Sequence, residues 1–87
     1  MTLSFPNRSR YYDTTLRAVR FWGHDSALET AFVVTDEALK RVQPDMLLDE
    51  AECLRAFDAN RDLIHAVAAK AYNRGHKASV RLVSTDF

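Results

Sequence analysis

The sequence predicts an α+β fold in two layers, in which an antiparallel sheet of about four strands is packed by one short and one long helix. Three observations predict it: a long amphipathic stretch at 45–75, a hairpin pattern at 16–34 and an alternating segment at 78–82. The expected order of elements is β-β-β-α-α-β. A chain of 87 residues suits a single domain, residues 1–87.

Residues 45–75 form the predicted long helix because both ends carry boundary signals. Asp45 follows Pro44 and can cap the first turn through its side-chain oxygen. Gly75 can take the left-handed conformation that ends many helices. A helix of about 28 residues spans about 42 Å, more than so small a domain easily covers. We therefore expect one end to project, to break or to meet a second subunit.

Strands are expected on both sides of the helical region. Segment 3–6 alternates apolar and polar residues and ends at a proline, which suits a short edge strand. Segments 16–22 and 28–34 are predicted to pair as a hairpin, with the turn chemistry supplied by residues 23–26. Segment 78–82 alternates again and forms the last strand.

A short helix is predicted between the hairpin and the long helix. Thr35 can cap its N-terminus, and Asp36 and Glu37 occupy its first turn, where the helix dipole favours acidic residues. Pro44 ends it after about two turns. The chain therefore enters its helical layer directly after the hairpin.

The composition is that of a globular protein rather than a disordered or membrane-spanning one. Hydrophobic residues make up 47% of the chain and charged residues 28%. The longest apolar run is far shorter than a membrane span, and the N-terminus lacks the pattern of a signal peptide. Cys53 is the single cysteine, so no internal disulfide can form. We therefore expect a cytoplasmic protein without membrane association.

The residue pattern predicts no enzyme activity, no cofactor and no metal site. Cys53 and His65 would lie about 18 Å apart along one helix, beyond hydrogen-bond reach. The three histidines lack metal-ligand spacing. The run His24-Asp25-Ser26 has the residue types of a catalytic triad, but neighbours in a tight turn cannot adopt its geometry. A catalytic interpretation would require a pocket that joins His24 or His65 with a carboxylate and Arg61.

Arg61 and Trp22 have unusual positions in the pattern. Arg61 falls within the apolar stripe of the long helix, so its charge needs an ion pair, or its stem must lie along the core with the head in water. We expect this structural role rather than a ligand-binding one. Phe21 and Trp22 should point to opposite faces of a strand, which makes one of them core and the other a surface contact. For this pair we expect packing rather than stacking on nucleic-acid bases.

Short motifs spread over almost the whole chain resemble those of one bacterial family. They are Phe5-Pro6, Tyr12-Asp13, Val19-Arg20-Phe21-Trp22-Gly23, Glu37-Ala38-Leu39, then Phe57, Arg61, Ile64, Ala68 and Tyr72, and finally Asp86-Phe87. On these residues the chain resembles the bacterial domain of unknown function family 1488, and the run at 19–23 is the most specific part. The resemblance implies a small single-domain α+β bacterial protein. It brings no established activity and no catalytic residues.

The leading functional hypothesis is a non-catalytic protein-interaction or regulatory module. We also expect a homodimer, because short edge strands ending near Pro6 or Phe87 could pair across a two-fold axis. The possible interaction surface comprises Arg8, Arg10, Trp22, Arg61, Arg74, Lys77 and Arg81.

The alternative hypothesis is a nucleic-acid-binding, transcription-regulator-like protein. The net charge is zero overall, but it is positive in residues 1–24 and 53–87 and negative in residues 25–52. If the last strand pairs beside the first, the basic residues of the two ends form one cationic strip that could bind phosphates. The acidic middle weakens long-range attraction to nucleic acid, so this hypothesis ranks second.

Overall fold

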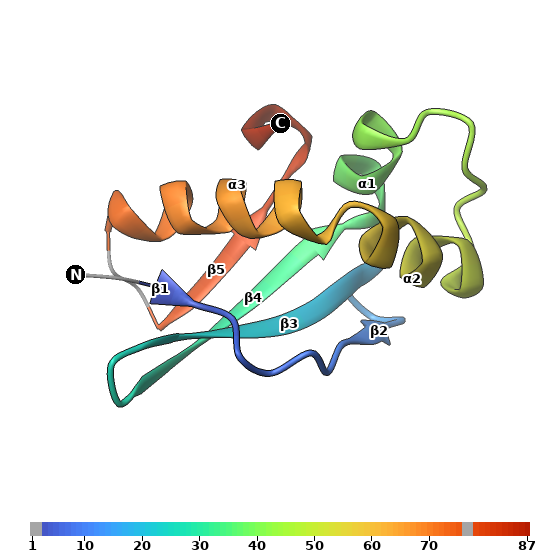
Figure 1. Ribbon diagram of the computed structural model, residues 1–87. Helices are drawn as coiled ribbons and strands as arrows, with labels where there is room; N and C mark the ends of the chain where they lie inside the picture. Colours follow the sequence, from blue (N-terminus) through green and yellow to red (C-terminus); the bar gives the residue numbers. More distant parts are fainter. Residues whose placement is uncertain (1–2, 76–77) are drawn as a thin grey trace.

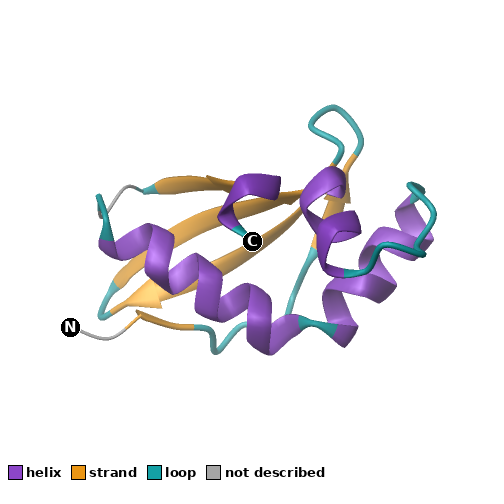
Figure 2. Cartoon of the chain, turned by 90° about the horizontal axis from the view of Figure 1, so that it is seen from above, coloured by secondary structure: helices purple, strands orange, loops and turns teal. Residues whose placement is uncertain are grey.

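A computed structural model describes residues 3–75 and 78–87 and shows a mixed α+β arrangement (Figure 1). Its elements are β1 (Leu3–Ser4), β2 (Tyr11–Asp13), β3 (Ala18–Asp25), β4 (Leu28–Thr35), α1 (Asp36–Val42), α2 (Glu50–Ala59), α3 (Arg61–Asn73), β5 (Ser79–Leu82) and the 3-10 turn η1 (Ser84–Asp86). The strands form one sheet, and all three helices lie on the same side of it (Figures 1 and 2). The predicted α+β fold class is confirmed.

The sheet has the strand order β1-β3-β4-β5, and β2 also pairs with β3. β1 and β2 meet β3 at its two ends: Leu3 lies opposite Asp25, whereas Tyr12 lies opposite Val19. The hairpin of β3 and β4 supplies the long central pair. The predicted hairpin and first edge strand are confirmed, and β2 is a strand that the sequence did not predict.

The last strand departs from the predicted antiparallel sheet, because β5 runs parallel to β4. The reason is the connection between the two strands. Three helices carry the chain from the end of β4 back to the beginning of β5, and such a helical crossover allows two strands to run in the same direction. All other strand pairs are antiparallel, so the sheet is mixed but largely antiparallel.

The hairpin turn also differs from its prediction. The turn consists of Ser26 and Ala27, and Ser26 has the positive φ, 57°, that short hairpin loops favour. Gly23, predicted as a turn residue, lies inside β3 instead. A side chain there would place its Cβ 2.9 Å from the Phe5 ring. Gly23 is therefore required for space rather than for backbone conformation.

The predicted single long helix is wrong: it is two helices that meet at Asn60. Asn60 donates through its side-chain nitrogen to the Ala56 carbonyl oxygen at 2.8 Å and to Gln43 Oε1 at 3.2 Å. Asparagine side chains that bond the backbone in this way compete with a continuous helix. Of the outcomes expected for an overlong helix, the break is the one that occurs.

The boundaries of the helical region differ from their predictions as well. α2 begins after Asp49, whose Oδ1 accepts from the Glu52 N–H at 2.8 Å, and not after Asp45. The chain between α1 and α2 first turns Met46 into the core, where it is buried. No described glycine has a positive φ, so Gly75 does not end α3 in the predicted conformation. The cap of the short helix is confirmed: Thr35 Oγ1 accepts from the backbone N–H of the third residue of α1 at 3.1 Å.

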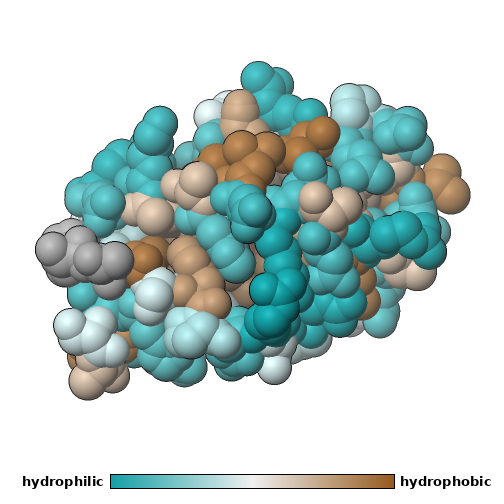
Figure 3. All heavy atoms as spheres, viewed as in Figure 1, coloured by the Kyte–Doolittle hydropathy of each residue, from teal (hydrophilic) through white to brown (hydrophobic). Residues whose placement is uncertain are grey.

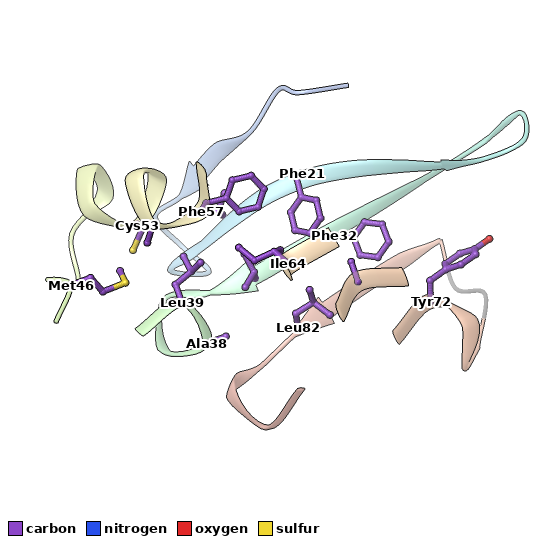
Figure 4. Packing of buried hydrophobic residues seen from close by; sticks show 14 residues of the cluster. Phe21, Phe32, Ala38, Leu39, Met46, Cys53, Phe57, Ile64, Tyr72 and Leu82 are labelled. Carbon is purple, nitrogen blue, oxygen red and sulfur yellow. The ribbon is translucent and has the colours of Figure 1, made fainter. Parts of the chain in front are cut away.

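The core fills the space between the sheet and the helices (Figure 4). The Phe21 ring lies 5.2 Å from the Phe32 ring and 5.1 Å from the Phe57 ring, measured between centroids. Met46 and Cys53 pack at one end of the cluster and Tyr72 at the other (Figure 4). The helix-facing side of the sheet is thereby covered along its length.

Candidate functional surfaces

The thiol of the single cysteine, Cys53, lies in the core. Cys53 is fully buried on α2, and its burial, together with the carboxylates of Asp36 and Asp49, raises its pKa to about 11. A reactive cysteine has a lowered pKa and some exposure, so Cys53 is a core residue. Within residues 3–75 and 78–87, no group of three or more histidine, cysteine or acidic side chains could hold a metal ion. His76 lies outside the described residues.

Arg61 anchors the N-terminal segment to the junction of α2 and α3. Its Nη2 donates to the carbonyl oxygen of Arg8 at 2.9 Å and to Asp58 Oδ1 at 3.0 Å. Its guanidinium lies 4.9 Å from the centroid of the Phe57 ring. Arg10 donates twice more to Asp58, at 2.8 and 3.1 Å, and these hydrogen bonds lower the pKa of the Asp58 carboxyl. Of the two structural roles predicted for Arg61, an ion pair or a stem that lies along the core, the ion pair is confirmed.

A groove of about 440 Å³ beside this ion pair joins His65 and Arg61 with the carboxylates of Asp58 and Asp62. This is the combination that a catalytic interpretation requires. The His65 ring, however, stacks on Phe5 with 4.0 Å between centroids, and among the described residues it has no hydrogen-bond partner. Burial and then the Arg61 charge lower the pKa of His65. The groove therefore contains a neutral, packed imidazole rather than a histidine oriented by a carboxylate.

The arginines of the predicted cationic strip lie in separate places. β5 is at the opposite border of the sheet from β1, so the last strand does not pair beside the first. Arg8 and Arg10 lie near the junction of α2 and α3, whereas Arg74 donates to Asp86 Oδ1 at 3.3 Å. Lys77 lies outside the described residues. The premise of the strip is therefore wrong, because the helical crossover carries β5 to the far side of β4.

Trp22 lies on the face of the sheet that is turned away from the helices, which we call the open face. Phe21 is 1% exposed, whereas Trp22 is only half-buried, so the expectation of opposite faces is confirmed. The Trp22 ring packs against Tyr11, with 5.9 Å between centroids. Tyr11 is itself 49% exposed. Two aromatic rings thus lie together where no described helix covers the sheet.

Charged residues surround these rings on the open face. In the register of the sheet, Arg20, Val33 and Arg81 form one row across three strands, next to the row that contains Trp22. Arg20 pairs with Asp13 at 3.1 Å. The Arg81 side chain has no ion-pair partner among residues 3–75 and 78–87. The structure therefore places two of the predicted interaction residues, Trp22 and Arg81, on the same face of the sheet.

Sequence reasoning missed an apolar groove on the helical side of the molecule. It has a volume of about 540 Å³ and is lined largely by Val42, Leu63, Val67 and Phe87. Hydrophobic residues gather over α3 and the C-terminal turn in the space-filling view (Figure 3). Leu63 and Val67 lie at the edge of the apolar stripe of the helical region. This position was the sequence feature that could have indicated the groove. Leu63 remains 48% exposed.

These features define a small α+β protein whose sheet has one covered and one open face. A family model described as "Protein of unknown function (DUF1488)" matches residues 3–83, so the chain belongs to this family. The fold is also that of a protein of unknown function from the DUF1488 family of Shewanella loihica PV-4. That crystal structure matches with a TM-score of 0.81 and 15% sequence identity, over 94% of each chain. No curated protein matches.

No helix among the described residues is both long and apolar enough to cross a membrane.

Proposed function

We propose that this protein is a non-catalytic protein-interaction module that contacts its partner through the open face around Trp22. The observation that carries the proposal is the pairing of the Trp22 and Tyr11 rings on the side of the sheet without helices. Tryptophan, tyrosine and arginine are the residues that contribute most to binding energy at protein interfaces. Packing against the core does not require an aromatic pair at this place.

The charges of the open face favour a partner with an acidic residue beside an apolar contact. Asp13 compensates Arg20, and His24 lies 3.7 Å from Glu29. Among the described residues of the open face, this leaves Arg81 as the charge available for an ion pair with the partner. The proposed setting is the bacterial cytoplasm, which the single unpaired cysteine supports.

The non-catalytic part of the proposal is supported by the groove beside Arg61. A general base must be free to reach the proton that it removes, and a second group commonly orients it. The His65 ring is stacked on Phe5, and Asp58 accepts hydrogen bonds from two arginines. These groups hold the N-terminal segment against the helices.

The test starts by photo-crosslinking through a benzophenone amino acid at position 11, with crosslinked proteins identified by mass spectrometry. The partner is then purified, and its affinity for variants is measured by calorimetry. Trp22→Ala should weaken binding about thirtyfold, the effect of losing a central interface residue. Arg81→Glu should also weaken it, and more strongly at low salt.

Leu63→Ala is the matched control, because it truncates an exposed apolar residue on the helical side. It should leave the affinity unchanged. A partner whose binding depends on Leu63 and not on Trp22 would contradict the proposal. So would a purified protein that turns over a substrate and loses that activity in His65→Ala.

A further inference from the structure

The outer edge of β5 leaves backbone groups without a strand partner. β5 pairs with β4, and no other strand of the described residues lies beside it. The Ala31 N–H donates to the Ala78 carbonyl oxygen at 3.0 Å. Because alternate residues of a parallel strand bond to the same neighbour, Val80 and Leu82 direct their peptide groups toward β4. Those of Ser79 and Arg81 therefore point outward.

This open edge is short and has a defined end. The Val83 N–H donates to Asp86 Oδ2 at 2.8 Å, so η1 closes the edge after β5. A groove of about 500 Å³ follows the edge between β5 and α3 and is lined in part by Ala71, Arg74 and Val80. Val80 is only half-buried. The edge thus offers both hydrogen-bonding groups and uncovered apolar surface.

We propose that β5 pairs antiparallel with β5 of a second copy of this chain, with the two-fold axis beside Val80. This inference goes beyond the proposed function, because it assigns a partner to a surface that Trp22 does not form. In this register Ser79 and the partner's Arg81 exchange two hydrogen bonds, and the symmetric pair exchanges two more. The two outward N–H groups and two outward carbonyl groups of each β5 are then all hydrogen-bonded.

Charge and the extent of strand overlap favour this register over its two neighbours. A pair centred on Arg81 would place two guanidinium groups directly opposite each other, which is destabilising. A pair centred on Ser79 would leave only Ser79 of β5 opposite a residue of the other β5, so fewer hydrogen bonds would form between the two strands. Centred on Val80, each Arg81 faces a small serine, and the two Val80 side chains meet beside the groove. The edge is therefore complementary to itself in one register.

The pairing also extends the open face. Ser79 and Arg81 have their side chains on the same side of the sheet as Trp22, as the register of the strands requires. Two copies joined through β5 therefore form one continuous sheet, with the two sets of helices on one side and both Trp22 rings on the other.

The test is the solution mass over a concentration series, measured by light scattering coupled to gel filtration. The wild-type protein should approach twice its 9.9 kDa monomer mass as concentration rises. Ser79→Arg places an arginine opposite the partner's Arg81 twice per dimer, and should raise the dissociation constant on the order of tenfold. Ser79→Glu places a carboxylate there and should lower it by a similar factor.

Both substitutions change one exposed residue whose peptide group does not bond to β4, so the monomer fold is retained. Trp22→Ala should leave the mass unchanged, which separates this inference from the proposed function. A monomer at every concentration in both wild type and Ser79→Glu overturns the inference. A dimer whose affinity is the same in Ser79→Arg and Ser79→Glu overturns it as well, because its interface must then lie elsewhere.

Discussion

The two faces of β3 carry aromatic residues at adjacent positions in very different surroundings. Phe21 is 1% exposed and packs against the rings of Phe32 and Phe57 on the helix side. Trp22 is half-buried on the open face and has Tyr11 as its aromatic neighbour. One step along a strand reverses the side-chain direction. That single step separates a residue that the core requires from one that it does not.

The difference shows which residues of the run at 19–23 serve the fold and which do not. Within the run at 19–23, Val19 and Phe21 fill the core, and Gly23 leaves space for the Phe5 ring. Arg20 and Trp22 point the other way, where packing places few limits on residue size. A tryptophan at such a position is consistent with the partner contact that we propose for the open face.

The substitution expected to reduce stability most is on the side of the sheet that the helices cover. Phe21→Ala should lower the free energy of unfolding by about 3–5 kcal/mol, because it leaves a cavity among packed rings. Urea unfolding followed by circular dichroism measures this directly. Phe21→Leu, which keeps most of the volume, should lose much less. A loss below about 1 kcal/mol for the alanine variant would contradict the assignment of this face as the core.

Gly23→Ala should have the next largest effect, about 1–3 kcal/mol, because overpacking forces neighbours to move. Its Cβ would lie 2.9 Å from the Phe5 ring and 3.1 Å from the Phe32 ring. The double variant with Phe5→Ala provides the control, since removing that ring also removes the closest clash. The summed single losses should exceed the loss of the double variant by at least about 0.5 kcal/mol. Strict additivity would show that Phe5 is not the obstacle.

The sequence predicted which helix residues are buried better than it predicted where the helices begin and end. Apolar spacing identified the stripe that includes Ile64, Ala68 and Tyr72, all of which are buried. It did not reveal the helix break, because Asn60 interrupts the helix through a tertiary contact with Gln43 as well as through the local bond to Ala56. Periodicity contains no information about such partners.

The site was less predictable than the fold for a related reason. Strand pairing decides which arginines meet, and pairing depends on the path of the crossover rather than on residue pattern. The length of α3 separates Arg8, which is bonded to Arg61 at the start of that helix, from Arg74 at its C-terminal end. The placement of β5 beside β4 brings Arg81 to the face of Trp22. Alternation alone did predict that Phe21 and Trp22 diverge, because that requires only the geometry of one strand.

Acid should lower the free energy of unfolding through His65, which packs on the covered side and whose pKa is lowered chiefly by burial. The unfolded state keeps the ordinary histidine pKa of about 6.5, so below that pH it binds more protons than the folded state. Stability should therefore fall as pH drops from about 6.5 to the lowered folded-state pKa, and then level off until carboxylates titrate. Unfolding at a series of pH values measures this. His65→Phe should remove the loss in that window, and an unchanged slope in this variant would assign it to another group.

Trp22→Ala should have the smallest effect on stability, no more than about 1 kcal/mol, because surface substitutions rarely cost more. The same urea experiment compares it directly with Phe21→Ala, and the two substitutions lie one residue apart in one strand. The Tyr11 ring would lose its neighbour, but β2 would stay attached through its pairing with β3 and through the ion pair of Asp13 with Arg20. If Trp22→Ala costs as much as Phe21→Ala, the open face is a second core surface that another layer must cover. A small cost combined with lost partner binding would instead assign Trp22 to recognition, since stability and binding would then depend on opposite faces of the same strand.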